Sequence, residues 1–528
     1  MSRETWATRF GVILAVAGSA IGLGNFLRFP GQAVLHGGGA FMIAYLTAFL
    51  FLGLPIAWAE WTLGRYSGIR GYNSAAGIFR CVTKNRSMAY AGSLVVTLTT
   101  VISAFYIFVE SWCLAYALRY LFGWMPDSNF DSVFKESAGL QGNGALFQSG
   151  FWNFNIFCLL FCLAFNYLLI YRGIVKGIEW FCSFALPCLL ICALVMMFRV
   201  LTLGNPTGIE GQDLLNGLGF VWNPSQPDKT FLESLSDPET WLAAAGQVFF
   251  SLSLGFGVIL TYASFARHDD DIALSSLTAA AANGFCEAVI AAMMIIPAAY
   301  MFLGPAFFTQ ENLGSAFTIG FQALPDVFAQ MPMGQFFGFL FFFLLFLAAV
   351  TSSISTIQPA VTLLEEGLGL GRKASLTVAG TMITFGCFFT AYFTDNLLAL
   401  ATMDFWVCNI FVFLMAGVVI IIFGWVFGTK KGLAELNAGS QLRIPAWFGF
   451  VMKYISPLYL LIVFAAWAWL YLSERLVQIA GNSVVQMSLG FILFTALFNL
   501  FVTSQALIRW ERKEKQQNND QDGIFFSG

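Results

Sequence analysis

Five hydroxyl side chains fall within six residues of an otherwise apolar segment. The segment reads Ala348-Ala349-Val350-Thr351-Ser352-Ser353-Ile354-Ser355-Thr356. On a helix, Thr351 and Ser355 share one face, and Ser352 and Thr356 share the neighbouring one. A hydroxyl in a membrane helix often bonds only to the preceding turn of that helix. A cluster this dense instead favours a hard cation, because such ions take oxygen ligands rather than sulfur or imidazole.

Two pairs of glycines interrupt long apolar runs. They are Gly22-Leu23-Gly24, followed by Asn25, and Gly255-Phe256-Gly257 in the second half of the chain. Each glycine costs a helix about 1 kcal/mol relative to alanine, and an unpaired backbone group in hydrocarbon costs several kcal/mol more. Two broken helices at corresponding positions of two halves indicate a transporter with a binding site near the middle of the membrane. The alternative is a pair of glycine-rich helix-packing faces.

Carboxylates inside apolar segments need a partner or a function, because a charge at the centre of the bilayer costs at least about 2.5 kcal/mol. Glu287 lies four residues after Asn283, on one face of a helix. Glu110 lies within another apolar run, and Arg28 and Asp404 lie within or at the end of two more.

The elements that must position these residues are membrane helices. The chain has 528 residues, 58% hydrophobic and 10% charged, whereas a soluble protein carries about 25% charged residues. This composition is typical of an all-α polytopic membrane protein in a lipid bilayer. The absence of a basic tract excludes a nucleic-acid partner. The residues form no nucleophile–base pair, and the glycines follow no strand, so an enzyme is not expected.

We expect about twelve spans. They lie near residues 10–35, 40–65, 88–122, 151–171, 174–201, 240–266, 272–303, 336–368, 374–394, 396–427, 447–472 and 484–508. Residues 305–332 are expected to form a re-entrant or surface helical loop. Lysine and arginine gather in one set of connections and at both ends of the chain, which predicts two cytoplasmic termini.

The domain organisation follows from these spans. Residues 1–510 are expected to form one transmembrane domain, and residues 511–528 a polar, disordered cytoplasmic tail. The first apolar run lacks a cleavage site and is expected to remain as the first membrane helix. Short termini and small outer loops favour a bacterial inner-membrane protein.

Several motifs together resemble the neurotransmitter:sodium symporter family, and in particular its bacterial amino-acid carriers with the LeuT fold. The motifs are Trp6-Ala7-Thr8-Arg9, Gly22-Leu23-Gly24-Asn25-Phe26-Leu27-Arg28-Phe29-Pro30, Gly37-Gly38-Gly39-Ala40-Phe41, Glu110-Ser111-Trp112, Leu252-Ser253-Leu254-Gly255-Phe256-Gly257 and Asp404-Phe405-Trp406. The resemblance extends from about Arg3 to the last span.

This resemblance implies a fold and an activity. The fold has inverted repeats of five helices each at about 8–202 and 240–428, extra helices at about 447–508, and spans 1 and 6 unwound at mid-membrane. The activity is sodium-coupled symport of small amino acids by alternating access. Sodium and substrate would share a ligand, so each would raise the affinity of the other.

The resemblance also implies site residues. The substrate residues are Ser19, Ala20, Gly22, Gly24, Ile102, Tyr106, Phe250, Ser251, Ser253, Phe256, Ser352 and Thr356. The first sodium site uses Ala20, Asn25, Ser251 and Asn283 together with the substrate carboxylate. The second sodium site uses Gly18, Ile21, Ala348, Thr351 and Ser352. Glycine at position 22, where monoamine carriers have aspartate, leaves room for a substrate carboxylate and so favours an amino acid.

Gates and anion dependence follow from the same resemblance. Arg28 and Asp404 resemble an outer gate, with Tyr106 and Phe250 as a lid below it. The cytoplasmic gate would comprise Arg3, Trp6, Ser264 and Glu366. Glu287 stands where animal members carry serine and bind chloride, so transport is expected to need no chloride. Proton antiport through Glu287 is a further hypothesis.

Other interpretations stay open on the residues alone. An ion channel would need a continuous pore with rings of like groups, which the paired breaks and opposed gates argue against. A carrier of another solute, or a transport-inactive sensor on the same fold, is separated from an amino-acid symporter only by flux. The preferred amino acid, the ion stoichiometry, the role of the tail and the oligomeric state, with a homodimer as one alternative, are left open.

Overall fold

A computed structural model describes residues 4–148, 150, 153–223, 230–308 and 316–525, and these residues form helices and no strand. Ten helices are long and apolar enough to cross a membrane, and an eleventh crossing is formed by two helices bent by 43° at residues 21–23. The remaining expected span, 240–266, is present as two helices separated by six residues, each too short to cross alone. The expectation of about twelve spans is met in this way.

The first half of the chain supplies five spans. Their helices are α1 (Arg9–Ala20), η1 (Gly24–Arg28) and α2 (Phe29–Leu35); α3 (Gly39–Ala48), η2 (Phe49–Gly53) and α4 (Leu54–Gly68); α6 (Met88–Leu121); α9 (Phe154–Tyr171); and η3 (Ile174–Glu179) with α10 (Trp180–Leu201). Shorter helices in the connections are α5 (Ala75–Thr83), α7 (Phe130–Ala138), α8 (Ala145–Gln148), α11 (Leu214–Trp222) and α12 (Phe231–Ser236).

The second half supplies the remaining spans. They comprise α13 (Pro238–Ser251) and α14 (Val258–Ser264); α15 (Ile272–Phe285), η4 (Cys286–Ala291) and α16 (Ala292–Leu303); α20 (Gly334–Leu368); α21 (Arg372–Tyr392); η7 (Asp395–Leu397), α22 (Leu398–Asp404), η8 (Phe405–Phe411), α23 (Val412–Ile421), η9 (Ile422–Gly428) and α24 (Thr429–Leu436); α25 (Phe448–Phe450), η10 (Val451–Ile455) and α26 (Ser456–Gly481); and α27 (Ser483–Phe525).

The helices pack as two groups. One contains α1, α4, α13, α14 and α15, and the other is built around α6, α20, α10 and α21. Glycines allow close approach within the first group: a Cβ at Gly68 of α4 would lie 1.9 Å from the Ser264 carbonyl oxygen of α14. Small residues at such contacts let membrane helices pack backbone against backbone. Of the interrupted helices, α1 and α14 pack against α20, which packs along α6, while α13 packs on α3.

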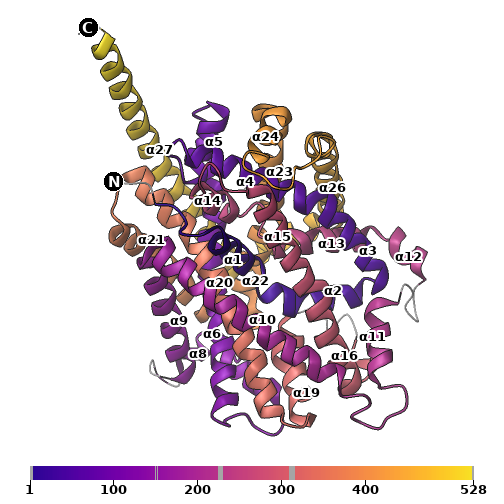
Figure 1. The fold of residues 1–528 in the computed structure, drawn as a ribbon. Coiled ribbons are helices and arrows are strands. Elements are labelled where there is room, and N and C mark those ends of the chain that lie inside the picture. The colour runs from indigo at the N-terminus through magenta and orange to yellow at the C-terminus, as the bar shows by residue number, and fades with distance from the viewer. Residues whose placement is uncertain (1–3, 149, 151–152, 224–229, 309–315, 526–528) are drawn as a thin grey trace.

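The two ends of the bundle differ. The N-terminus, α5, α24 and the far end of α27 lie at one end, here called the terminus side, and α11 and α19 lie towards the other, the loop side (Figure 1). The segment expected to form a surface helical loop contains η5 (Pro305–Phe307), α18 (Ala316–Thr318), η6 (Ile319–Ala323) and α19 (Leu324–Gln330). Its side chains Ile319 and Phe321 are buried, so this loop packs onto the bundle.

The tail departs from the sequence prediction. Residues 511–525 are helical rather than disordered, because α27 continues unbroken from the last span to Phe525 (Figure 1). Glutamate, lysine and glutamine, which dominate residues 511–518, are good helix formers. The first turn beyond the span is also held by ion pairs of Glu511 with Arg86 at 3.0 Å and of Glu514 with Arg80 at 2.8 Å.

Candidate functional site

The first interruption lies between α1 and η1. Ile21 leaves the helical conformation, with φ −78° and ψ 84°, and the Gly22 N–H donates to Asn25 Oδ1 at 3.0 Å. The Leu23 N–H donates to the Tyr106 hydroxyl at 3.3 Å. A Cβ at Gly24 would lie 2.5 Å from the Phe250 ring, so glycine is required here by the close approach of the second interrupted helix.

The second interruption joins α13 to α14. Ser253, Gly255 and Gly257 all have positive φ, at 55°, 78° and 77°. Positive φ is tolerated readily by glycine and rarely by other residues. The Gly255 N–H is freed from the helix and donates to Glu60 Oε1 at 2.9 Å. The expectation that spans 1 and 6 are unwound is therefore confirmed.

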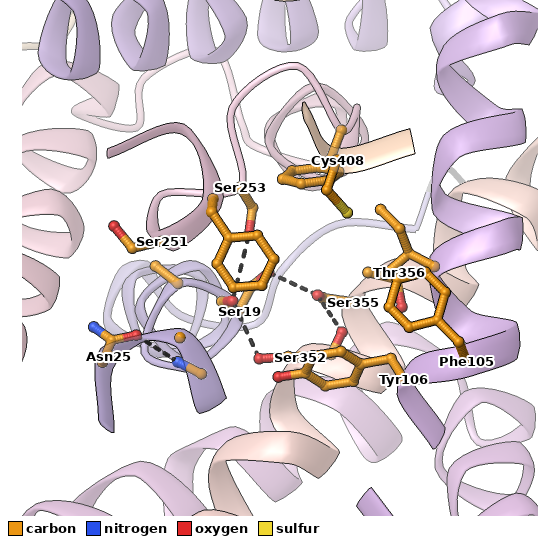
Figure 2. A pocket seen from close by; sticks show the side chains of 16 residues that line it. Ser19, Asn25, Phe105, Tyr106, Ser251, Ser253, Ser352, Ser355, Thr356 and Cys408 are labelled. Atoms are coloured by element: carbon orange, nitrogen blue, oxygen red, sulfur yellow. Dashed lines mark hydrogen bonds between the residues drawn. The ribbon is translucent and has the colours of Figure 1, made fainter. Parts of the chain in front are cut away.

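A cavity lies between the two interruptions, α6 and α20 (Figure 2). All twelve residues expected to bind substrate line it: Ser19, Ala20, Gly22, Gly24, Ile102, Tyr106, Phe250, Ser251, Ser253, Phe256, Ser352 and Thr356. Four further lining residues are Asn25, Phe105, Ser355 and Cys408. No charged side chain is among the described residues that line the cavity.

The side chains expected at the first sodium site form one buried chain of hydrogen bonds. Asn25 Nδ2 donates to Asn283 Oδ1 at 2.8 Å, and Asn283 Nδ2 donates to Ser251 Oγ at 3.2 Å. All three side chains are at most 2% exposed. Amide and hydroxyl oxygens with a freed carbonyl at Ala20 make a set of neutral oxygen ligands, which suits a hard monovalent cation.

The residues expected at the second sodium site join α1 to α20. A Cβ at Gly18 would lie 3.3 Å from Thr351 Cβ. The hydroxyls of Thr351 and Ser352 both donate to the Ala348 carbonyl at 3.0 Å, and Ser352 also reaches the Ser19 carbonyl at 3.3 Å. The end of α1, with the Ile21 carbonyl beside its last turn, thus faces the oxygen-rich stretch of α20.

The expected outer gate is not closed by an ion pair. Among the described residues, the Arg28 guanidinium makes no ion pair within 4.0 Å, and it lies instead over the Phe250 ring, 5.0 Å from the centroid. Arg28 also lines a second cavity on the loop side, together with Glu239, Phe405 and Trp467. Arg28 and Phe250 therefore separate the central cavity from this outer one.

The expected cytoplasmic gate is closed on the terminus side. Trp6 is 2% exposed, its Nε1 donates to the Tyr262 carbonyl at 2.9 Å, and its ring meets the Tyr262 ring edge-on. The Ser264 hydroxyl donates to the Thr261 carbonyl at 2.7 Å and lies 3.4 Å from the Asn73 carbonyl oxygen, while Glu366 accepts from the Asn73 N–H at 2.7 Å. The structure thus brings Trp6, Ser264 and Glu366 to one side, and Arg3 lies outside the described residues.

The family follows from comparison with known proteins. Models of the sodium:neurotransmitter symporter family match residues 3–145 and 133–512. The chain belongs to this family. Its fold is the LeuT fold: the crystal structure of MhsT in complex with L-phenylalanine aligns with a TM-score of 0.74 and 29% identity, over 88% of this chain and 100% of MhsT.

Bacterial relatives span almost the same length. An uncharacterized sodium-dependent transporter of Haemophilus influenzae is 28% identical over 481 residues, covering 88% of this chain and 97% of the relative. The sodium-dependent transporter YhdH of Bacillus subtilis is 29% identical over 474 residues, covering 87% and 96%. This chain is a multi-pass, sodium-dependent symporter.

In this symporter Glu287 is buried among hydrogen-bond donors next to the first sodium-site residues. Tyr45 donates its hydroxyl to Glu287 Oε2 at 2.7 Å, Asn283 Nδ2 lies 3.4 Å from the same oxygen, and Gln247 Nε2 donates to Oε1. Glu287 itself is fully buried. Among the described residues, the Glu287 carboxyl group is therefore held by neutral partners, beside the place where a cation is expected.

Two other buried carboxylates of this symporter are braced differently. Glu110 accepts from Asn166 Nδ2 at 2.8 Å and from the Ser353 hydroxyl, so it joins α6, α9 and α20 behind the cavity. Glu60 was not singled out from the sequence, although a carboxylate within an apolar span is the signal that could have found it. It holds the second interruption open through Gly255.

Proposed function

We propose that this symporter carries neutral amino acids together with sodium, and that Gly22 is the feature that admits the substrate carboxylate. The supporting observation is the close packing at this position: a Cβ there would lie 2.9 Å from Ser352 Oγ and 3.2 Å from the Tyr106 hydroxyl. Any side chain at position 22 would fill the space beside the Tyr106 hydroxyl. Glycine keeps that space for a ligand.

The two interruptions offer opposite charges to a zwitterion. The N–H groups at the start of η1 carry the partial positive charge of a helix N-terminus, which favours a carboxylate. The carbonyl groups at the ends of α1 and α13 carry partial negative charge, which favours an ammonium group. An α-amino acid bears both groups, and MhsT, a protein of similar structure, was solved in complex with L-phenylalanine.

Sodium coupling follows from the two expected sites. The first, at Asn25, Ser251 and Asn283, adjoins the cavity, so a bound cation there would attract the substrate carboxylate. The second, at Thr351 and Ser352, would fasten α1 to α20. We propose that release of the sodium ion from this second site to the cytoplasm frees the N-terminal segment. We also propose that the protein lies in the bacterial inner membrane with both termini in the cytoplasm.

The test is uptake by purified protein in liposomes, with each of the twenty amino acids and with sodium replaced by potassium in parallel. We expect sodium-dependent uptake of neutral amino acids, reduced at least tenfold in Asn25→Ala and in Thr351→Ala. The control is Asn499→Ala. Asn499 is another buried asparagine; it lies on α27, does not line the cavity, and donates to Thr97 Oγ1 of α6 at 3.1 Å. Folded protein with no sodium-dependent uptake of any amino acid would favour another solute or a sensor.

Glu287 supplies the proposed independence from chloride. Its fixed charge would balance sodium without a bound anion, so uptake by the native protein should be equal in chloride and in gluconate. In Glu287→Ser, uptake should require chloride, while Glu287→Gln should be impaired in both salts. Uptake by Glu287→Ser that is full without chloride would contradict this role. Outward proton transfer by Glu287 on the return step is a further part of the proposal, tested by sodium-driven alkalinisation of the liposome lumen that vanishes in Glu287→Gln.

A further inference from the structure

The side of the cavity away from Asn25 is lined by hydroxyl groups from α1 and α20. Figure 2 shows Ser355 and Thr356 on this side, with Phe105 next to them, and Ser19 between Ser355 and Asn25. Ser355 lies one residue before Thr356 on α20, and Ser19 approaches from α1, with Ser19 Oγ 2.6 Å from Ser355 Oγ. We define these three residues as the hydroxyl wall.

The protons of the hydroxyl wall are already used within the protein. Ser355 donates to the Ser352 carbonyl at 2.7 Å, and Thr356 donates to the Ser353 carbonyl at 2.9 Å. Because the Ser355 proton is engaged there, Ser19 is the donor in its contact with Ser355. A hydroxyl has one proton but two lone pairs. The wall therefore presents acceptors to the cavity.

Lone pairs remain on the oxygens of the hydroxyl wall after their hydrogen bonds within the protein are assigned. Ser355 accepts once, from Ser19, and Thr356 accepts at most once, from Ser103 Oγ at 2.9 Å on α6. Each of these oxygens keeps at least one free lone pair, and Ser19 keeps two. The three side chains line the cavity and are buried or half-buried, so their oxygens are shielded from bulk solvent.

The rest of the lining is apolar or neutral. Ile102, Phe105 and Phe256 are 6%, 5% and 4% exposed, and they enclose the cavity with Phe250. An ionised side chain would be desolvated here without a counter-charge, which costs several kcal/mol. A purely aliphatic side chain would leave the acceptors of the hydroxyl wall without a donor.

We propose that the hydroxyl wall selects neutral amino acids whose side chain donates a hydrogen bond, with serine and threonine as the representative substrates and Thr356 and Ser355 as the specificity-determining residues. This inference rests on the proposed function and deepens it. A site with buried partners for a substrate hydroxyl rejects the analogue that lacks it, whereas an apolar pocket discriminates weakly against an added hydroxyl. Threonine and valine have nearly the same shape, so their ratio isolates the hydrogen bond from size.

The experiment compares sodium-driven uptake of threonine with valine, and of serine with alanine, by full-length protein in liposomes. In the native protein we expect kcat/KM to be about tenfold higher for the hydroxyl-bearing member of each pair, because one neutral hydrogen bond contributes a difference of about that size. In Thr356→Val the threonine-to-valine ratio should fall to about one, and Ser355→Ala should lower it in the same direction. The matched control is Thr390→Val, because Thr390 is a buried threonine of α21 that bonds only to the Gly386 carbonyl of its own helix.

The possible results distinguish selection by the hydroxyl wall from amino-acid symport itself. Sodium-dependent uptake with a native threonine-to-valine ratio near or below one would overturn the inference and leave amino-acid symport standing. A high native ratio that survives in both α20 variants would overturn the role of the hydroxyl wall. If no amino acid shows sodium-dependent uptake, both amino-acid symport and selection by the hydroxyl wall are contradicted. The native ratio alone decides the first point, even where a variant fails to fold.

Discussion

The two gates of this symporter are built from different kinds of contact. On the terminus side, Trp6 is buried and tied to α14 by a backbone-directed hydrogen bond and by its ring. On the loop side, Arg28 rests on the Phe250 ring and makes no ion pair among the described residues. A buried aromatic anchor costs several kcal/mol to remove, whereas a cation–π contact contributes about 0.5–2 kcal/mol. The residues proposed for the terminus-side gate are therefore held by stronger contacts than those proposed for the loop-side gate.

This difference explains how one ion can control one gate. The N-terminal segment is continuous with α1: the Ala7 N–H, the Thr8 N–H and the Thr8 hydroxyl all donate to Glu179, and Thr8 caps the helix through the Gly11 N–H. The far end of α1 faces Thr351 and Ser352. A cation between α1 and α20 would therefore hold the whole rigid helix, and with it Trp6. Among the described residues, the contact given for the Arg28 guanidinium is with Phe250 and not with the residues proposed for the second sodium site.

The largest expected effect comes from removing the aromatic anchor. Trp6→Ala should lower the initial rate of sodium-driven uptake about a hundredfold, because a loss of about 3 kcal/mol favours an open terminus side. Trp6→Phe keeps the ring against Tyr262 but loses the Nε1 bond, and should cost about fivefold. An uptake rate of Trp6→Ala within twofold of the native rate would contradict the claim that Trp6 holds the terminus side closed.

Removing the outer cover should have a smaller and different effect. Arg28→Ala should reduce uptake about tenfold, since closure over the substrate then lacks both the cation–π contact and a charge to meet Asp404. Equilibrium binding of substrate in sodium should change less than about threefold, because Arg28 does not line the central cavity. Arg28→Lys, which keeps the charge, is the control. A larger loss of binding than of uptake would place Arg28 in the substrate site and not in a gate.

A substitution at Glu366 tests whether closure of the terminus-side gate needs contacts other than those of Trp6. Its carboxylate accepts from the Asn73 and Ser74 N–H groups at 2.7 and 2.6 Å. Both bonds reach the same oxygen, Oε2, so the amide oxygen of Glu366→Gln can accept both and only the charge of the acceptor is lost. Uptake should therefore fall about fivefold. The neighbouring Glu365→Gln is the control, since Glu365 pairs with Arg372 at 3.5 Å and is partly exposed. Equal losses in the two variants would contradict a specific role for Glu366.

The smallest effect is expected from the tail. Glu514 is 51% exposed where it pairs with Arg80, and exposed ion pairs contribute at most about 1 kcal/mol. Uptake by Glu514→Gln should stay within twofold of the native rate at low salt and at 0.5 M salt, measured in parallel with Glu366→Gln. A loss as large as that of Glu366→Gln would extend the terminus-side gate to α27.

The interruptions were predictable because their signal is local. Two glycines around one residue in an apolar run are costly unless the helix opens, and the structure opens both helices at Gly22 and at Gly255. The residues lining the cavity followed from the family pattern. Phe105, Ser355 and Cys408 were not among the expected substrate residues. Ser355 had been noted only as part of the hydroxyl cluster, Phe105 precedes the named Tyr106, and Cys408 lies four residues after the named Asp404.

Other features depend on information that a sequence pattern does not carry. Arg28 and Asp404 were expected to pair as an outer gate, but the Arg28 guanidinium lies over the Phe250 ring instead, and the family motif does not specify that contact. The partner of Glu60 is a backbone N–H that exists only because α13 stops, so no residue type marks it. The helical tail was mispredicted because its polar composition resembles disorder, while its continuity with a membrane helix and its pairing with Arg80 favour a helix.

The most direct test is hydrogen–deuterium exchange of the native, label-free symporter in sodium and in potassium. We predict that in sodium the peptides covering residues 4–11 and 258–267 are strongly protected while those covering 28–38 and 239–249 exchange faster. Replacement of sodium by potassium should raise exchange on the terminus side and change the loop side little. Exchange at residues 4–11 that does not respond to sodium, or faster exchange there than at the outer gate, would contradict the account that sodium holds the terminus side closed.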